Sequence, residues 1–421
     1  MNNVQTGIQA FGEVSCEIRE ALRETLLHAY ATFGVYRKMF GGLGISREGI
    51  TRLDPLHLLQ ELPLLQGETF RRLAEEALLV GDRIVDVETS SGTTGPRKRR
   101  FISHADDLSE TRFLAELFGV CGIGRSDSVA CVDVDPLAVG VSFARALDLL
   151  GVQEAYTYCV GPDPAIGVRG LAKLDPSVIV TVPSIIEGCF ESLEALYAGM
   201  PDARLSKLVY VGEPLPPRTR RALETALGVE VFGYYGASET SALGIECSAH
   251  DGIHLFTDRF ITEMVPDGLE SRSGQIVVTT LRQEALPLLR YALGDTIQVK
   301  AGECHCGLRY PRVEVTGRVG DSISVLGAEI GYDGIMAALC EPEDGPGFMQ
   351  LVLTREGRDR MTIVIPESQR EQEAEIRERL FRGQPDLDFL VAGEYIELEF
   401  SFVDERFIGA ARKRKRIADL R

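Results

Sequence analysis

Hydrophobic and polar positions follow two different periods along the middle of the chain. Apolar residues recur at helical spacing from Ala105 to Phe118, and a short apolar run follows from Ser128 to Val132. Further helix-like and strand-like stretches succeed one another at 141–150, 177–182, 185–196, 207–211 and 217–227. Such alternation is typical of parallel strands joined by crossover helices, so we predict an α/β fold.

The flanking regions show other patterns. Residues 14–44 carry apolar positions at helical spacing and predict a packing helix. Shorter strands follow residue 253, and after residue 321 the order strand, strand, helix, strand predicts a small α+β domain. A chain of 421 residues is too long for one small core. The expected parts are a large multi-subdomain region with parallel and mixed sheets at 1–320, whose β-rich portion is about 245–320, and a C-terminal domain at 321–421.

The composition narrows the class of protein. Hydrophobic residues make up 44% and charged residues 26% of the chain, which is ordinary for a globular protein. A net charge of −18 argues against broad binding to nucleic acid or to anionic membranes, because these attract excess Lys and Arg. No signal-peptide pattern or membrane-spanning run is visible, and nine cysteines in a long chain indicate reduced thiols. A cytoplasmic location is therefore expected.

One stretch, from Thr89 to Arg100, combines hydroxyls, glycines and cations directly after a strand-like run at 82–87. Glycines let a backbone approach a ligand closely, N–H groups in a tight turn bind anions, and hydroxyls with Lys or Arg complete a phosphate cradle. We therefore predict a loop that binds a triphosphate, although its spacing is not that of a P-loop. An exposed polar hairpin is the alternative.

The string SSGTTGPRKRR at 90–100 resembles the phosphate-binding signature of the acyl-adenylate-forming (AMP-binding) superfamily. The strings at 232–240, 290–296 and 316–321 resemble three further motifs of that superfamily, in the same order. The string at 211–214 and the ending at 413–419 are most similar to its phenylacetate-CoA ligase branch. The resemblance implies an adenylate-forming domain at 1–320 and a mobile lid at 321–421.

The resemblance also implies a reaction. ATP converts a carboxylic acid, aryl or arylacetic, into an acyl-adenylate, and the acyl group passes to the thiol of coenzyme A. A carrier-protein phosphopantetheine or another nucleophile is the alternative acceptor. A relative that binds nucleotide without turnover is a further alternative, motivated by Pro96 directly after Gly95. The expected partners are thus a small carboxylic acid, an acyl carrier protein in the alternative reading and a second copy in a homodimer, but no nucleic acid and no membrane.

Several residues of these motifs are expected to bind MgATP. Glu239 follows a glycine turn and is expected to bind Mg²⁺, because hard cations prefer carboxylate oxygen; a surface acid is the alternative. Asp295 is expected to accept both ribose hydroxyls and Arg318 to reach ribose or phosphate, unless they form an ordinary ion pair. The phosphate-binding residues are expected to be Ser90, Ser91, Gly92, Thr93, Thr94, Gly95 and Lys98, and Thr94 is also placed with Glu239 among the catalytic residues.

Other candidates lie at predicted strand ends, where ligands of parallel sheets bind. Loops at 183–184, 212–214 and 234–236 are expected to converge on one cleft, unless Pro and Gly only punctuate them. Tyr234 and Tyr235 are expected to frame the adenine, with core packing as the alternative. Further expected nucleotide-binding residues are Gly212, Glu213 and Gly236. By resemblance alone, the acyl pocket includes Phe143, Ser184 and Tyr234.

The C-terminal basic run receives its interpretation from the resemblance. Lys413 falls on the position of the family's catalytic lysine, whose ammonium bridges the acyl carboxylate and the α-phosphate during adenylation. Lys415 takes this role if the register shifts. Asp321 matches the hinge about which the lid turns.

Cysteines and histidines form a separate candidate site. Cys247, His254, Cys304 and Cys306 could close a tetrahedral, structural Zn²⁺ site, and some relatives of the phenylacetate-CoA ligase branch carry a zinc in this region. His250 is the alternative to His254. The competing interpretation is a turn with free cysteines.

Overall fold

The computed structural model divides into two compact units, each assembled from separate segments. Unit 1 comprises Met1–Arg125, Arg145–Gly151 and Phe232–Arg318. Unit 2 comprises Ser126–Ala144, Val152–Val231 and Val319–Arg421. The residues that the structure describes are 9–10, 14–80, 84–89, 98–133, 136–160, 164–200, 202–215, 217–266, 271–319, 322–325, 328–339, 349–356, 358–404 and 417–420.

Unit 1 begins with a group of helices. Ser15 caps the first of them with its hydroxyl, and Asp54 caps another just before Pro55. The predicted helical stretch at 14–44 is broken at Phe33, which is extended and fully buried, and the backbone N–H of Val35 then donates to the Glu76 carboxylate at 3.2 Å. The helices are α1 (Cys16–Thr32), α2 (Gly34–Gly42), α3 (Arg47–Arg52), α4 (Pro55–Glu61) and α5 (Gly67–Val80).

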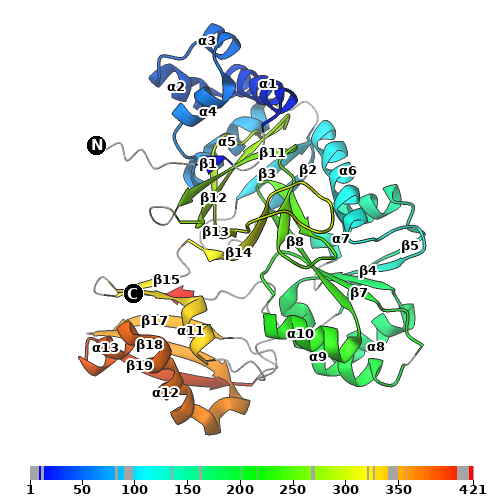
Figure 1. Ribbon diagram of the computed structural model, residues 1–421, viewed down its shortest axis with the longest axis vertical. Helices are drawn as coiled ribbons and strands as arrows, with labels where there is room; N and C mark the ends of the chain where they lie inside the picture. Colours follow the sequence, from blue (N-terminus) through cyan, green and yellow to red (C-terminus); the bar gives the residue numbers. More distant parts are fainter. Residues whose placement is uncertain are drawn as a thin grey trace. The chain divides into compact units, whose positions relative to one another are not determined.

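The body of unit 1 is an antiparallel sheet, most of whose strands are drawn in green and yellow in Figure 1. The β-rich portion expected from the sequence is present, and the strand predicted at 275–280 lies within β12. The order is β1 (Gln9–Ala10), β11 (Phe260–Pro266), β12 (Ser273–Thr280), β13 (Tyr291–Val299), β14 (Arg312–Arg318), β10 (Ile253–Leu255), β9 (Ser241–Glu246) and β8 (Glu230–Ala237).

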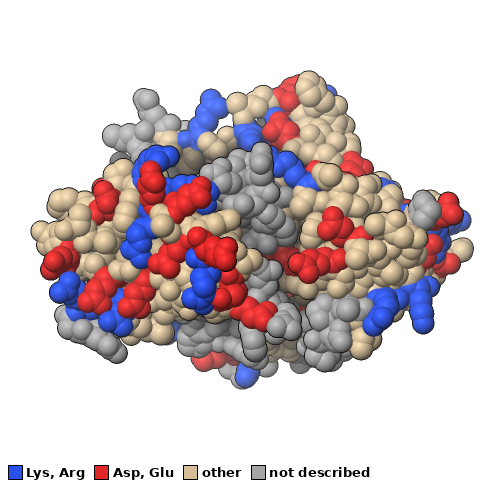
Figure 2. Space-filling model, turned by 90° about the horizontal axis from the view of Figure 1, so that it is seen from below, with Lys and Arg blue, Asp and Glu red and all other residues tan. Residues whose placement is uncertain are grey.

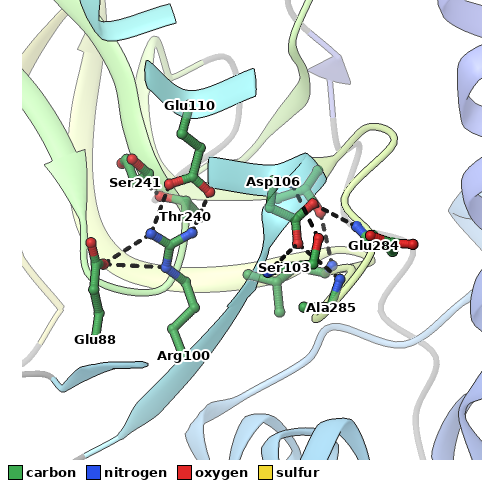
Figure 3. A network of polar contacts seen from close by, with 11 residues as sticks. Glu88, Arg100, Ser103, Asp106, Glu110, Thr240, Ser241, Glu284 and Ala285 are labelled. Carbon is green, nitrogen blue, oxygen red and sulfur yellow. Dashed lines mark hydrogen bonds and ion pairs between the residues drawn. The ribbon is translucent and has the colours of Figure 1, made fainter. Parts of the chain in front are cut away.

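A hairpin of β2 (Ile84–Thr89) and β3 (Arg99–Ser103) carries the candidate phosphate loop between its strands. Helix α6 (His104–Val120) follows directly, and Ser103 and Asp106 form a capping box at its start. The same Asp106 carboxylate accepts the backbone N–H groups of Glu284 at 2.7 Å and Ala285 at 2.9 Å (Figure 3). One side chain therefore ties the hairpin and α6 to the loop that precedes β13.

Part of unit 2 has the α/β pattern predicted from the sequence. Its four strands are parallel in the order β7, β6, β4, β5, and every residue of β4 is buried, as expected for a strand covered on both faces. The elements are β4 (Ser128–Asp133), α7 (Pro136–Leu149), β5 (Glu154–Cys159), α8 (Pro164–Leu174), β6 (Val178–Thr181), α9 (Pro183–Tyr197), β7 (Lys207–Tyr210) and α10 (Pro217–Leu227).

The C-terminal part of unit 2 is a small α+β arrangement with its own apolar core. Four strands in the order β19, β18, β17, β20 pack their buried side chains against helices, and the predicted strand, strand, helix, strand order is present. The sequence did not predict β20 or α13. The elements are β15 (Ser322–Val325), β16 (Ala328–Gly331), α11 (Tyr332–Leu339), β17 (Gln350–Glu356), β18 (Arg358–Pro366), the 3₁₀ helix η1 (Glu367–Gln372), α12 (Glu373–Gly383), α13 (Pro385–Ala392), β19 (Ile396–Val403) and β20 (Ile417–Asp419).

Two surface properties bear on function. On the face shown in Figure 2, acidic and basic side chains are interspersed. Within the described ranges, no helix has both the length and the apolar character that crossing a bilayer requires. The α/β class with a small α+β C-terminal part is confirmed, whereas the exact boundary at 320 and 321 falls on residues outside the described ones and stays a prediction.

Candidate active site

Glu239 lies in the turn between β8 and β9 and is buried, with 8% of its surface exposed. Its Oε1 accepts a hydrogen bond from Lys98 Nζ at 2.7 Å and another from the hydroxyl of Tyr291 at 3.0 Å. Lys98 Nζ also donates to Tyr291 Oη at 2.9 Å. These three residues, which we name the Glu239 cluster, bring together three of the motif strings that lie far apart in sequence.

The electrostatics of the Glu239 cluster keep its carboxylate charged. Burial raises the pKa of Glu239, but the Lys98 ammonium and the hydrogen bonds from Lys98 and Tyr291 outweigh it, so the pKa lies below its ordinary value. Burial and the Glu239 charge raise the pKa of Tyr291, so its phenol stays protonated and can donate. The cluster thus presents an anionic oxygen ligand, the kind that Mg²⁺ prefers.

Tyr291 lies in the motif string at 290–296, but the sequence analysis gave it no role. The preceding residue, Arg290, has a φ of 51°, which is unusual for a residue other than glycine. The buried Arg290 side chain pairs with Glu263 at 3.1 Å and donates to the Leu62 carbonyl at 2.6 Å. The reach of Tyr291 to a residue 52 positions earlier was not visible in the sequence, because no spacing rule connects them.

Asp295 forms a second group on β13 and β14. Its Oδ2 accepts the Tyr235 hydroxyl at 2.8 Å, and its Oδ1 pairs with Arg318 Nε at 3.0 Å. Asp295 and Arg318 are directly opposed in the strand register, and Gly294 before them has a φ of 86°. Each carboxylate oxygen has a second lone pair, so Asp295 can accept further hydrogen bonds from a ligand while Tyr235 and Arg318 fix its orientation.

Tyr234 occupies a different environment from its neighbour. A Cβ on Gly236 would lie 3.1 Å from the Tyr234 ring and 2.6 Å from the Ser241 carbonyl oxygen, so a larger residue would collide with backbone. Tyr234 is half-buried, and burial together with the charges of Glu88 and Glu110 raises its pKa. The ring is therefore fixed in place as a neutral phenol.

Glu88 and Glu110 share a buried arginine, Arg100, whose exposed fraction is 1% (Figure 3). Arg100 Nη2 lies 2.9 Å from Glu88 Oε2, and its two terminal nitrogens lie 2.5 and 2.9 Å from the two oxygens of Glu110. Glu88 and Arg100 are register partners next to the end of the β2–β3 ladder. This Arg100 cluster, which the sequence analysis missed, clamps the base of the candidate phosphate loop.

Unit 2 brings together two of the loops that were predicted to converge. Glu213 Oε2 accepts the backbone N–H of Ser184 at 3.0 Å, and Glu213 Oε1 accepts the Ser184 hydroxyl at 3.2 Å. Gly212 has a φ of 77°, which allows the tight turn that presents Glu213. Helix α9 has no capping side chain of its own, so Glu213 supplies one from outside. Phe143 is buried in the same unit.

The candidate metal ligands also assemble. The ligand atoms of Cys247, His254, Cys304 and Cys306 all lie within 4.8 Å of one another. The Cys247 and Cys304 sulfurs are 3.6 Å apart, and Cys306 Sγ is 3.4 Å from His254 Nε2. Tetrahedral Zn²⁺ with Zn–S of about 2.3 Å and Zn–N of about 2.0 Å places its ligand atoms roughly 3.5–3.8 Å apart, so the set fits.

The structure also orients the histidine of this set. The Tyr310 carbonyl lies 3.2 Å from His254 Nδ1, and because a carbonyl only accepts, Nδ1 carries the proton and Nε2 is left to face Cys306. His250, the alternative ligand, lies instead 3.8 Å from Glu246. His254 is thus the histidine of the cluster.

Several expected site residues lie outside the described residues, so the structure says nothing about them. These are Ser90, Ser91, Gly92, Thr93, Thr94, Gly95, Asp321, Lys413 and Lys415.

Comparisons with known proteins give the family of the chain. The model of the AMP-binding enzyme family matches residues 48–266. The chain is 28% identical over 358 residues to a phenylacetate-coenzyme A ligase of Thermus thermophilus, which covers 80% of this chain and 78% of that protein. It is 23% identical over 343 residues to an indoleacetate–lysine synthetase of Pseudomonas savastanoi, covering 78% of this chain and 81% of that protein.

A solved structure shares the fold. It is a 2-hydroxyisobutyryl-CoA ligase in the postadenylation state in complex with R3-HIB-AMP, with a TM-score of 0.75 and 20% identity over 97% of this chain and 90% of that one. Because the family match covers more than half of the chain, this protein belongs to the AMP-binding enzyme family. Within that adenylate-forming superfamily it is phenylacetate-CoA ligase-like.

Proposed function

We propose that this protein is an AMP-forming acid–thiol ligase that activates an aryl or arylacetic acid with ATP and transfers the acyl group to coenzyme A. In the first step a carboxylate oxygen bonds to the α-phosphorus and pyrophosphate leaves. In the second, the thiol sulfur bonds to the acyl carbon, and AMP and a proton leave. The observation that carries the proposal is the hydrogen-bonded assembly of three family motifs in the Glu239 cluster.

The described residues suggest how the nucleotide is held. Glu239 is the proposed Mg²⁺ ligand, and the ion would neutralise phosphate charge when bound. Asp295, whose orientation Tyr235 and Arg318 fix, is the proposed acceptor of the ribose hydroxyls. Tyr234, seated against Gly236, offers an aromatic face to the adenine.

The remaining proposed roles depend on the resemblance. The loop at 90–95 cradles the β- and γ-phosphates together with Lys98, and Lys413 stabilises the charge that develops at the α-phosphate. Residues 321–421 form the mobile lid, with Asp321 as its hinge. Ser184, whose orientation Glu213 fixes, is the proposed pocket residue, and Phe143 of the same unit is proposed as further lining.

A structural Zn²⁺ is proposed for the Cys and His set. Four protein ligands would leave no open position, so the ion would stabilise the strands around it and take no part in the reaction. Metal analysis of purified protein is expected to give one zinc per chain, lost in Cys304→Ser. Zinc contents that are equally low in both proteins would contradict this assignment.

One comparison favours a different acceptor. The indoleacetate–lysine synthetase relative is named for joining an acid to an amine, and no described residue of this chain distinguishes thiol from amine. The second candidate function is therefore transfer of the acyl-adenylate to an amine or to a carrier-protein phosphopantetheine. Mass spectrometry of the product formed with coenzyme A, lysine or a phosphopantetheinyl carrier separates these acceptors.

The first test is ATP–pyrophosphate exchange with a panel of aryl, arylacetic, fatty and amino acids. Exchange is expected with one class of acid and should collapse in Lys413→Ala, while Lys415→Ala serves as the register control. Binding of nucleotide without exchange for any acid would overturn the ligase assignment in favour of a silent nucleotide-binding relative.

A further inference from the structure

Lys98 contacts the same carboxylate that is the proposed ligand for Mg²⁺. Its ammonium lies 2.7 Å from Glu239 Oε1, and 28% of the Lys98 side chain is exposed. Lys98 therefore belongs both to the predicted phosphate-binding stretch and to the Glu239 cluster.

Tyr291 and Gly67 determine the position of the Lys98 side chain. The ammonium donates to Tyr291 Oη at 2.9 Å and lies 5.7 Å from the centre of the Tyr291 ring. At the start of α5, a Cβ on Gly67 would lie 3.3 Å from Lys98 Cε, closer than most real contacts. The side chain of Lys98 thus runs past a residue without a side chain and ends on Glu239.

An ammonium and a metal ion cannot both use this oxygen in the same way. Oε1 has two lone pairs, which accept the hydrogen bonds from Lys98 and Tyr291, so Mg²⁺ at about 2.0–2.1 Å from this atom displaces at least one of the two donors. Two cations at such a distance also repel each other, most strongly where water is scarce. Of the two donors, Lys98 is the one that a metal ion repels, so metal at Glu239 Oε1 favours the departure of Lys98, and ATP phosphates offer its ammonium new anionic partners.

We propose that Lys98 is a built-in counter-ion that excludes divalent metal from Glu239 until nucleotide phosphates draw it away. The inference rests on the proposed role of Glu239 as metal ligand. It makes metal and nucleotide bind with positive coupling, because each favours the arrangement in which Lys98 has left Glu239. Thermodynamic linkage makes this coupling reciprocal, so nucleotide raises metal affinity by the same factor as metal raises nucleotide affinity.

The test is titration of the full chain with Mn²⁺, a spectroscopic substitute for Mg²⁺, followed by electron paramagnetic resonance without nucleotide. Lys98→Met is expected to gain a site that binds Mn²⁺ at least about 10-fold more tightly than wild type, which corresponds to ~1.4 kcal/mol. Lys98→Arg keeps the cation and should resemble wild type. The exposed neighbour Arg99→Met is the matched control and should also resemble wild type.

Two results would overturn the proposal. Equal Mn²⁺ affinity in wild type and Lys98→Met would show that Lys98 does not exclude metal. Persistence of the gained site in Lys98→Met/Glu239→Gln would show that the metal binds elsewhere. Neither result depends on turnover, so failure here is distinguishable from failure of the proposed function, which the pyrophosphate-exchange assay decides.

Discussion

The Glu239 cluster and the Arg100 cluster of unit 1 each join a cation to at least one carboxylate, and their cations are only two positions apart. Lys98 is 28% exposed and pairs with Glu239, whereas Arg100 is 1% exposed and serves both Glu88 and Glu110. Arg100 binds through several nitrogens at once, while Lys98 presents a single point charge. The contacts of Arg100 with its two carboxylates are thus expected to persist, whereas Lys98 is expected to leave Glu239 when nucleotide binds.

The two clusters also shift their acids in opposite directions. Burial raises the pKa of Glu110 and outweighs the opposing effect of Arg100, whose charge is shared with Glu88. At Glu239 burial also raises the pKa, but the charge of Lys98 and the hydrogen bonds from Lys98 and Tyr291 reverse the outcome. The comparison teaches that a nearby cation does not by itself make a carboxylate a stronger acid.

The largest expected effect comes from breaking the buried cluster. Arg100→Met leaves two carboxylates without their shared partner and is expected to lower the free energy of unfolding by about 3–5 kcal/mol. Urea denaturation of the full chain measures this. Arg99→Met, at an exposed neighbouring position, is the matched control and should change stability by less than about 0.5 kcal/mol. Equal midpoints for the two variants would refute a structural role for the Arg100 cluster.

Glu239→Gln disrupts the Glu239 cluster and is expected to lower activity strongly and stability only slightly, the opposite of Arg100→Met. Loss of the anionic ligand is expected to reduce kcat/KM about 100-fold, or ~2.7 kcal/mol of transition-state stabilisation. Its stability should fall far less than that of Arg100→Met, because the pair is partly solvated. Kinetics at saturating MgATP measure the first effect and urea midpoints the second. A Glu239→Gln protein that is unstable but has normal kcat/KM contradicts the division of roles.

The contributions of Glu110 and Glu239 to the free energy of unfolding should change with pH in opposite directions. The pKa of Glu110 is raised in the native state. Its stabilising contribution is therefore fully present at pH values below 4.5, the ordinary pKa, and is lost as the pH rises through the native pKa. The pKa of Glu239 is lowered in the native state. Its stabilising contribution is therefore present at pH values above 4.5 and is lost as the pH falls through the native pKa. Each slope is at most about 1.4 kcal/mol per pH unit.

The measurement is the difference in unfolding free energy between wild type and each of Glu110→Gln and Glu239→Gln across this pH range. The difference should fall with rising pH for Glu110→Gln and rise for Glu239→Gln. Parallel curves for the two variants would mean that the environments of the two acids are alike.

The smallest expected effect tests one hydrogen bond. Tyr291→Phe removes the donor to Glu239 at 3.0 Å and the acceptor of Lys98 at 2.9 Å, while the ring packing against Phe70 remains. Loss of about 1 kcal/mol, or roughly 5-fold in kcat/KM, is expected. Kinetics of the purified variant give the value, with Tyr235→Phe as a comparison at the Asp295 group. An unchanged kcat/KM would remove Tyr291 from the site.

Much of the fold was predictable because its patterns are local. The strand at 128–132 is a continuous apolar run, and it became the fully buried β4. The predicted helix at 14–44 was wrong in its continuity, because Phe33 is buried in an extended conformation that only tertiary packing selects. Strand β20 was not predicted because three residues beside a basic run have no readable period.

The site was predictable only where motifs carried it. Glu239 and Asp295 were named from their motif positions, and the four Cys and His ligands from their chemistry. Arg100 lies in the basic run at 97–100, which favours a phosphate-binding interpretation, and nothing in that run separates it from Lys98. Its burial depends on Glu110, whose position on α6 relative to β3 follows from packing.

The carboxylate of Asp106, which caps the start of α6 and holds the loop before β13, has a consequence for co-translational folding. Glu284 is 178 residues further along the chain, so at 5–20 residues per second the ribosome needs roughly 10–35 s to deliver it after Asp106. During that interval the early helices of unit 1 wait beside the ribosome without the strands that cover them. Chaperone dependence and aggregation of nascent chains should therefore peak before residue 284 emerges and decline once the loop can dock.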